Sequence, residues 1–202
     1  MRTILRGTEA ATLELSGEID AAVPAPFTPT GEASLLLFAM RDLALDGIRW
    51  PAFDYHEALW RIGVRLDGVP AWFAVRCDID SPVVRAIGRR LVRYPTRGAR
   101  FAWDASRWRV DTDDGKLAVE VADRSADADA APPRRTFVPS GERVFEIPWR
   151  EVPAPTCAVA RVAIADDALS TTSFGAPVRW STTARALAGR VHMCGIATPL
   201  RG

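Results

Sequence analysis

The sequence consists mainly of short apolar runs that end in turn signals, and this pattern constrains the fold more than any other feature. Residues 60–66 (WRIGVRL) alternate between apolar and polar side chains, which is the period of a half-buried strand. Asp67-Gly68 follows, a pair that favours a two-residue hairpin turn because both positions accept a positive φ. Residues 71–77 (AWFAVRC) then supply the returning strand, so we expect a β-hairpin here.

The same pattern recurs along the chain and predicts further strands. They are expected at residues 34–40, 101–103, 108–111, 116–121, 144–149 and 156–164, with a second hairpin turn at Asp114-Gly115. Residues 170–173 and 181–183 are expected to form polar turns. Residues 184–196 fit either a short helix or a strand, because apolar runs of this length suit both.

One helix is clearly marked, at about residues 82–93. Ser81 can cap its first turn, and Pro82 is favoured at the first helical position. The segment 83–93 has apolar residues at helical spacing, and Pro95 then stops the helix. Many strands with a single marked helix predict a mainly β protein, a β-rich α+β fold. The arrangement expected from this pattern is an antiparallel barrel or a sandwich.

The 202 residues fit one domain spanning 1–202. Residues 124–135 (RSADADAAPPRR) are polar and contain prolines, and we expect a mobile loop there rather than a domain boundary, because strand patterns resume at once. A barrel of this size can hold a small ligand inside. The expected partner is therefore a small molecule in the barrel cavity, and assembly into a homo-oligomer stays open.

Composition argues against several classes of function. The 26 basic and 25 acidic residues give a net charge of +1, which does not favour nucleic-acid binding driven by charge. No apolar run approaches the roughly 20 residues of a membrane helix, and the first residues lack a signal-peptide pattern, so we expect a cytoplasmic protein without a membrane partner.

The cysteines and histidines do not have the spacing of a metal site. Cys77, Cys157 and Cys194 are far apart and form no CxxC pair, and His56 and His192 form no zinc motif. We therefore expect neither a metal nor a cofactor. His192 lies in an apolar context and is expected to be a hydrogen-bonded core histidine.

The block from residue 55 to 97 resembles the acetoacetate decarboxylase family and its broader superfamily. The resembling features are Tyr55-His56-Glu57, the Asp67-Gly68 hairpin with Asp80 after its return strand, Ala86-Ile87-Gly88-Arg89 and Tyr94-Pro95-Thr96-Arg97. The family's helix similarly carries Ala-Val-Gly-Arg and ends in Tyr-Pro-Lys-Lys. Downstream, Asp114-Gly115-Lys116-Leu117 stands where the family has a similar Tyr-Gly-Lys-Leu turn. The resemblance implies a cone-like antiparallel barrel around an apolar cavity, and with it we expect a closed or cone-like antiparallel β-barrel.

The resemblance also implies a catalytic position that this chain fills differently. In the family's decarboxylases, the first lysine of Tyr-Pro-Lys-Lys forms a Schiff base with the substrate. Thr96 stands at that position and has no amine, while Arg97 takes the place of the second lysine. Glu57 matches the family's active-site glutamate, whereas the family's N-terminal arginine has no clear equivalent here. Lys116, the chain's one lysine, is expected to be exposed at a hairpin tip.

Five residues are the candidates for a site, each with an ordinary structural alternative. Glu57 is the candidate acid or base of the cavity, or else a loop glutamate. Thr96 is the second catalytic candidate, donating a hydrogen bond to a substrate carbonyl, or else a turn residue. Tyr55, Tyr94 and Arg97 are candidates for substrate binding, Arg97 through a bidentate bond to a carboxylate. Alternatively, the tyrosines pack and Arg97 pairs with a surface acid.

The predicted function is that of a small-molecule-binding, acetoacetate-decarboxylase-like protein without the Schiff-base lysine. It would act on a carbonyl or carboxylic-acid compound through acid–base chemistry at Glu57. As an enzyme it would be a Schiff-base-independent lyase, isomerase or cyclase. Two alternatives stay open: a non-catalytic ligand-binding barrel, and a domain that binds an acidic partner through Arg85, Arg89 and Arg93.

Overall fold

The computed structural model describes residues 5–45, 52–125, 134–152 and 156–200. Strands dominate it, as the sequence predicts. The elements are β1 (Leu5–Ile19), β2 (Thr28–Leu45), β3 (Phe53–Leu66), β4 (Val69–Ile79), α1 (Pro82–Ile87), the π-helical turn η1 (Gly88–Val92), β5 (Thr96–Gly98), β6 (Arg100–Trp103), β7 (Arg107–Thr112), β8 (Gly115–Ser125), β9 (Arg135–Ser140), β10 (Arg143–Ile147), β11 (Trp149–Val152), β12 (Thr156–Asp166), α2 (Ala168–Phe174), β13 (Val178–Ala188), β14 (Arg190–Cys194) and β15 (Thr198–Pro199).

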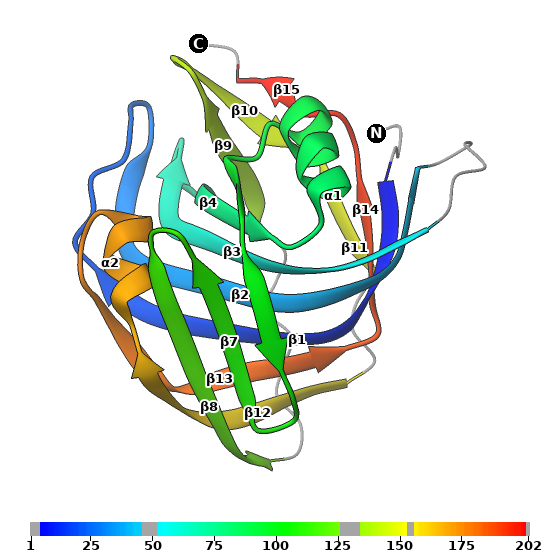
Figure 1. Cartoon of the computed structure of the whole chain (residues 1–202). Helices are drawn as coiled ribbons and strands as arrows, with labels where there is room; N and C mark the ends of the chain where they lie inside the picture. The colour runs from blue at the N-terminus through cyan, green and yellow to red at the C-terminus, as the bar shows by residue number, and fades with distance from the viewer. Residues whose placement is uncertain (1–4, 46–51, 126–133, 153–155, 201–202) are drawn as a thin grey trace.

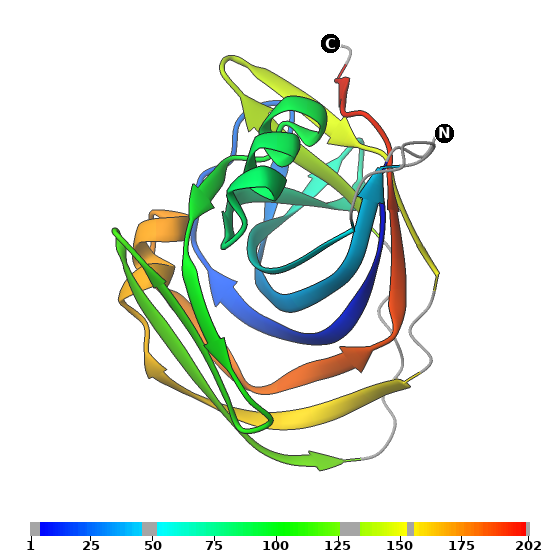
Figure 2. The ribbon, with the colours of Figure 1, turned by 45° about the vertical axis from the view of Figure 1, so that its right-hand side comes forward.

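The strands form one strongly curved 15-stranded sheet (Figures 1 and 2). Its main path runs β15-β10-β9-β4-β3-β2-β1-β13-β12-β8-β7-β6, while β14 pairs with β1 and β11, and β5 pairs with β4. The mainly β fold is thus confirmed, but closure of the barrel is not. Within the described residues the two ends of the path, β15 and β6, do not pair with each other. The sheet is also not purely antiparallel, because β4 runs parallel to both β5 and β9.

The block that includes the best-marked sequence signals folds as predicted. β3 and β4 form the expected hairpin, and its turn residues Asp67 and Gly68 have φ of 51° and 78°. Ser81 accepts a hydrogen bond from the backbone N–H of Val84 at the start of α1. The helix continues through η1 and ends at Arg93, whose φ of 62° is left-handed.

The second hairpin is confirmed with a shift of one residue. Thr112 and Gly115 are the last paired residues of β7 and β8, so the two-residue turn consists of Asp113 and Asp114. Gly115, with φ of 150°, is the first residue of the returning strand. Lys116 follows it and is exposed, as expected.

The sequence interpretation is wrong for the two polar segments of the C-terminal third. Residues 170–173 belong to helix α2, and residues 181–183 lie inside β13. Tertiary contacts explain the helix, since Ser170 is fully buried and its Oγ lies 3.3 Å from the indole Nε1 of Trp180, which donates to it. Leu169 and Phe174, which flank the polar residues 170–173, are buried and give the helix an apolar face.

The two remaining segments have mixed outcomes. Residues 184–196, ambiguous in sequence, are strand through the end of β13 and β14. The expected loop at 124–135 is shorter at both ends, because Arg124 and Ser125 end β8 and Arg135 starts β9. Residues 126–133 lie outside the described part of the chain, so the expectation of a mobile loop stays a prediction.

β2 is buried on both faces and separates two apolar cores. Leu35 and Leu37 point into the first core, where they pack with Trp60 and the strands that follow. Leu36 and Phe38 point into the second core, which α1 and η1 cover. This double burial explains the unbroken apolar run of β2, because apolar and polar residues need not alternate in a strand without a solvent-exposed face.

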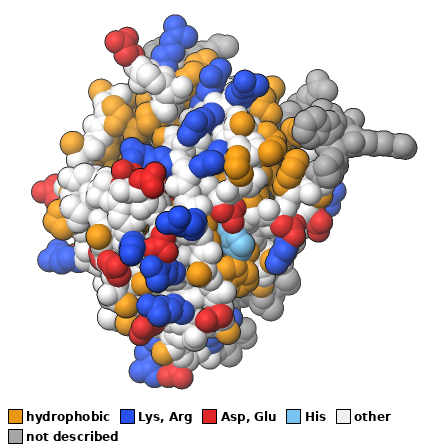
Figure 3. All heavy atoms as spheres, viewed as in Figure 1, with side chains coloured by type: hydrophobic (Ala, Val, Ile, Leu, Met, Phe, Trp, Pro, Cys, Tyr) orange, Lys and Arg blue, Asp and Glu red, His pale blue; other side chains and the backbone are white. Residues whose placement is uncertain are grey.

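The surface is consistent with the balanced composition. On the face seen in Figure 3, basic and acidic side chains are interspersed over the lower part, whereas basic side chains predominate in the upper part, where α1 lies. Among the described residues, no helix is long and apolar enough to cross a membrane.

Candidate functional site

The second core encloses a cavity of about 40 Å³ beneath α1 and η1. A single water molecule requires about 10–15 Å³ on this measure, so the cavity can hold a few waters or one small organic molecule. Its wall is mostly apolar. The lining residues are Leu5, Met40, Leu43, Tyr55, Glu57, Ile79, Val84, Ile87, Gly88, Val92, Tyr94, Trp149, His192 and Cys194.

Strand alternation brings the polar groups of this wall together. Tyr55 and Glu57 are two residues apart on β3 and therefore point to the same side of the sheet. His192 and Cys194 have the same spacing on β14. Tyr94 reaches the cavity from the segment that follows η1. Three of the five candidate residues, Tyr55, Glu57 and Tyr94, thus line one cavity.

Glu57 is the central ionisable group of the cavity. Its side chain is only 3% exposed, and its Oε1 accepts a hydrogen bond from the Sγ of Cys77 at 3.2 Å. Burial raises the pKa of Glu57 to about 7, and the hydrogen bonds donated by Cys77 and Tyr55 only partly oppose this rise. The charges of Glu9 and Asp78 raise it further. Glu57 therefore exchanges its proton close to neutral pH.

The neighbours of Glu57 are held in their protonated forms. Burial raises the pKa of Tyr55 and of Tyr94 well above the ordinary value, and the charge of Glu57 adds to the effect. Burial likewise raises the pKa of the Cys77 thiol. Two phenols and a thiol consequently remain hydrogen-bond donors around a single carboxyl group.

Thr96 does not share this cavity with Glu57. It is buried, but its Oγ1 accepts a hydrogen bond from Nε of Arg89 at 2.8 Å and donates to the carbonyl of Arg85 at 3.4 Å. Gly88 lines the cavity and packs against Thr96, since a Cβ on Gly88 would lie 3.2 Å from the Thr96 methyl. The described lining does not include Thr96, and the geometry fits a residue that fastens the helix to β5.

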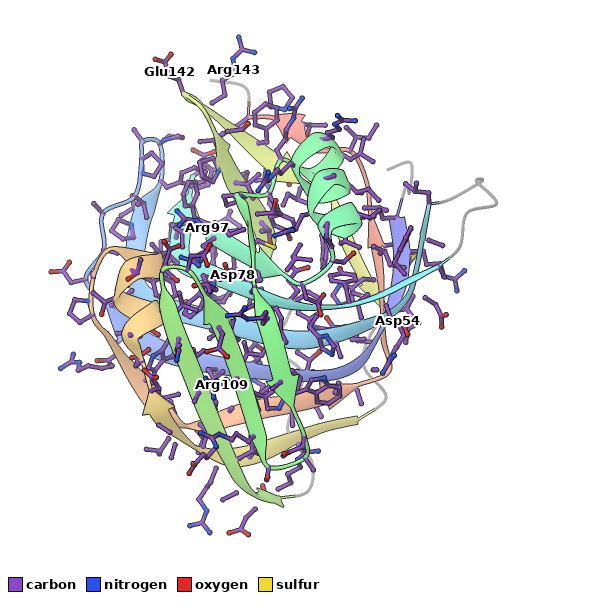
Figure 4. All side chains as sticks on the ribbon, in the orientation of Figure 1. Asp54, Asp78, Arg97, Arg109, Glu142 and Arg143 are labelled. Atoms are coloured by element: carbon purple, nitrogen blue, oxygen red, sulfur yellow. The ribbon has the colours of Figure 1, made fainter. Side chains whose placement is uncertain are left out.

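Arg97 points away from the cavity. Its side chain is 56% exposed and forms an ion pair with Asp114 at the β7–β8 turn. Figure 4 shows Arg97 close to Asp78 and above the β7–β8 hairpin. The geometry therefore favours the alternative in which Arg97 pairs with a surface acid. Glu57 then has no cation from Arg97 to oppose the rise of its pKa.

A buried ion pair supports β4 behind this surface contact. Nε of Arg76 donates to both carboxylate oxygens of Asp78, at 2.8 and 2.9 Å, and both side chains are almost completely buried. Trp60 donates its indole N–H to Asp78 at 2.8 Å. Arg76 also reaches Asp114 at 2.9 Å, so this network joins β3, β4 and the β7–β8 turn.

A second polar cluster, Glu9 with its partners, adjoins the cavity and was missed in the sequence. Glu9 is fully buried on β1, where Arg190 donates two hydrogen bonds to it at 2.9 and 3.0 Å. Thr12 donates a third at 2.6 Å, and Nε2 of His192 contacts Oε1 of Glu9. Burial raises the pKa of Glu9, but the hydrogen bonds and charges of His192 and Arg190 outweigh it and lower that pKa to about 2.

One signal in the sequence could have found this cluster. Leu5, Gly7 and Glu9 occupy alternate positions of β1 and all face inward, which places a charged residue in an apolar row. The structure also groups no three His, Cys, Asp or Glu residues into a metal-binding arrangement, as far as the described residues go.

No family model and no curated protein matches this sequence. Solved structures do match in fold. An acetoacetate decarboxylase structure is 14% identical, with a TM-score of 0.77 and coverage of 99% of this chain and 90% of that chain. The enduracididine biosynthesis enzyme MppR, with HEPES bound, is 12% identical with a TM-score of 0.74, covering 99% and 89%. An acetoacetate decarboxylase-like enzyme from Sphingomonas wittichii is 14% identical with a TM-score of 0.68, covering 100% and 94%. This chain therefore has the fold of acetoacetate decarboxylase and of the acetoacetate decarboxylase-like enzymes.

Proposed function

We propose that this protein binds a small carbonyl or carboxylic-acid compound in the cavity under α1 and moves a proton on it with Glu57. The observation that carries this proposal is a carboxyl group buried in an apolar cavity with a pKa of about 7. Such a group is populated both as acid and as base near neutral pH, which is the condition for efficient proton transfer.

The chemistry proposed does not involve a Schiff base. Thr96 has no amine and its hydroxyl is engaged with Arg85 and Arg89. Lys116 is exposed on β8, away from the cavity lining. An electron sink must therefore come from the substrate's own carbonyl oxygen, which the phenol of Tyr55 or Tyr94 can stabilise by donating a hydrogen bond.

Pyruvate is a suitable probe of this chemistry, since it is small and carries both a carbonyl and a carboxylate. The MppR enzyme, with 10% identity and a TM-score of 0.70, has been solved in complex with pyruvate. In the proposed step the carboxylate of Glu57 takes a proton from the methyl carbon of pyruvate. The electrons of the broken C–H bond form the C2–C3 double bond, and the carbonyl pair moves onto oxygen. Reversal in D2O returns a deuteron to the carbon.

The test is proton NMR of pyruvate in D2O, in which enzymatic exchange removes the methyl signal. We expect the wild-type protein to exchange the methyl protons. Glu57→Gln should slow the exchange by at least about 100-fold, because an amide keeps the shape but cannot transfer the proton. Asp54→Asn is the matched control. Asp54 lies on the same strand but is exposed and pairs with Arg41, and Figure 4 shows it at the outer end of β3.

A non-catalytic ligand-binding protein is the second candidate, favoured by the fact that Glu57 already accepts hydrogen bonds from Cys77 and Tyr55. In that case pyruvate, measured by its line broadening, would bind without any methyl exchange. Glu57→Gln would then change affinity alone.

A further inference from the structure

We infer that His192 is a second ligand-contacting group of the cavity, and that Glu9 positions it. The inference rests on the proposed function, because it concerns the same cavity and the same proton transfer. His192 lines the cavity from β14, whereas Glu57 lines it from β3. A small ligand that fills the cavity of about 40 Å³ therefore touches both walls.

The imidazole ring is held in one orientation. Phe38 stacks nearly parallel to it, with ring centroids 6.3 Å apart and an interplanar angle of 7°. Trp149 contacts it edge-on at 4.6 Å. Its Nε2 contacts the carboxylate of Glu9, which fixes the rotation of the ring within this aromatic slot. A ring fixed on three sides can hold a bound ligand in one orientation.

Glu9 also decides which ring nitrogen carries a proton. Because Arg190, Thr12 and His192 all donate to it, Glu9 remains a carboxylate at any ordinary pH. A carboxylate beside Nε2 favours the tautomer with its hydrogen on that nitrogen, and so fixes how the ring is presented to the cavity. Glu9 thus acts through His192 as a positioning residue and does not itself line the cavity.

The two walls are coupled electrostatically. The charge of Glu9 raises the pKa of Glu57, so the buried carboxylate acts on both proton-carrying groups. In the enolisation of pyruvate, Glu57 takes a proton from carbon while the ring of His192 contacts the substrate from the opposite wall and holds it in place. The negative charge that develops on the carbonyl oxygen is stabilised by the phenol of Tyr55 or Tyr94, and reversal returns the proton to carbon.

The chain has only two histidines, which makes a direct test simple. Protein labelled with 15N-histidine gives ring signals from His56 and His192 alone, and the variant His56→Gln assigns them. We expect pyruvate to shift the ring nitrogens of His192 and to leave those of His56 in place. His56 binds Asp80 and Trp103 and is not part of the cavity lining.

Three variants test the roles separately. His192→Gln should slow pyruvate exchange at least about tenfold with a smaller change in affinity, and His192→Phe, which preserves the aromatic packing, should do the same. His56→Gln is the matched control and should exchange at the wild-type rate. Glu9→Gln should shift the 15N signals of the His192 ring towards a mixture of tautomers, a change that a purely structural role would not produce.

The results separate this inference from the proposed function. The inference about His192 would be overturned if pyruvate bound without shifting the His192 signals, or if His192→Gln kept the full exchange rate. Neither result would contradict proton transfer by Glu57. A wild-type protein that neither binds nor exchanges pyruvate would overturn the proposed function, and the inference with it.

Discussion

The thiol of Cys77 donates a hydrogen bond to Glu57 across the β3–β4 pair, at 3.2 Å from Sγ to Oε1. The two residues are diagonal neighbours, since Glu57 is opposite Ile79 and Cys77 is opposite Leu59. This contact is one of the few that lower the pKa of Glu57, and burial still prevails. Because the carboxyl group of Glu57 titrates near neutral pH, its ionisation should affect both the stability and the activity of the protein.

Stability should fall with rising pH because of Glu57. Its pKa is raised from 4.5 to about 7, so the folded chain holds this proton more tightly than the unfolded chain. The stabilisation by the protonated form is complete below pH 4.5 and is lost as pH rises through about 7. Relative to wild type, Glu57→Gln should therefore gain about 3 kcal/mol between pH 4 and pH 8.5. Urea unfolding at both pH values measures this, and an equal difference at the two would contradict it.

The ionisation of Glu9 should change the pH dependence of stability in the opposite direction to that of Glu57. Its pKa is lowered from 4.5 to about 2, so its carboxylate stabilises the fold above pH 4.5, and this contribution disappears as pH falls through about 2. Glu9→Gln removes the buried carboxylate that Arg190 and His192 contact and should cost about 3–5 kcal/mol at pH 7. Unfolding curves from pH 7 down to pH 2.5 should show that the difference in unfolding free energy between wild type and variant becomes smaller. A difference that is constant with pH would contradict a contribution from the charge of Glu9.

The effects of substituting Arg76 and Asp78 on the free energy of unfolding should be strongly non-additive. Arg76→Met removes the ion-pair partner of the buried Asp78 carboxylate, leaves the indole N–H of Trp60 as its hydrogen-bond donor, and should cost about 3–5 kcal/mol. The double variant Arg76→Met/Asp78→Asn removes the stranded charge and should recover much of that loss. A double-mutant cycle by urea unfolding gives the coupling energy. Strictly additive losses would mean that the pair contributes no mutual stabilisation.

No imine should form with acetoacetate. Thr96 lacks an amine, and the chain's one lysine, Lys116, is exposed next to the β7–β8 turn. Mass spectrometry after borohydride reduction should show the unmodified mass in wild type and in a Lys116→Arg control. A substrate-sized adduct on Lys116 would refute Schiff-base-independent chemistry.

Local signals in the sequence were sufficient for the centre of the fold. The Asp67-Gly68 turn, the Ser81 cap and the apolar alternation of β3 each follow from the conformations that those residues allow, and all are present in the structure. The resemblance singled out Glu57, which lines the cavity in the structure. These features depend on neighbours along the chain, which a sequence displays directly.

The features that could not be predicted depend on contacts between distant segments. Glu9 is paired with Arg190 from β14, and without that partner a glutamate on a strand is expected to face water. Helix α2 depends on contacts such as that of Ser170 with Trp180. Thr96 is engaged by Arg85 and Arg89 and does not belong to the described cavity lining, which the resemblance alone could not indicate.

The pH dependence of pyruvate methyl exchange shows whether Glu57 is the group that moves the proton. If Glu57 is the base, its ionised form is the active one, so the exchange rate should rise with pH to a plateau, with a midpoint near 7. In Glu57→Gln the rate should stay at the background of free solution at every pH. A wild-type rate without a midpoint near neutral pH, or exchange that persists in Glu57→Gln, would contradict the assignment of Glu57 as the proton carrier.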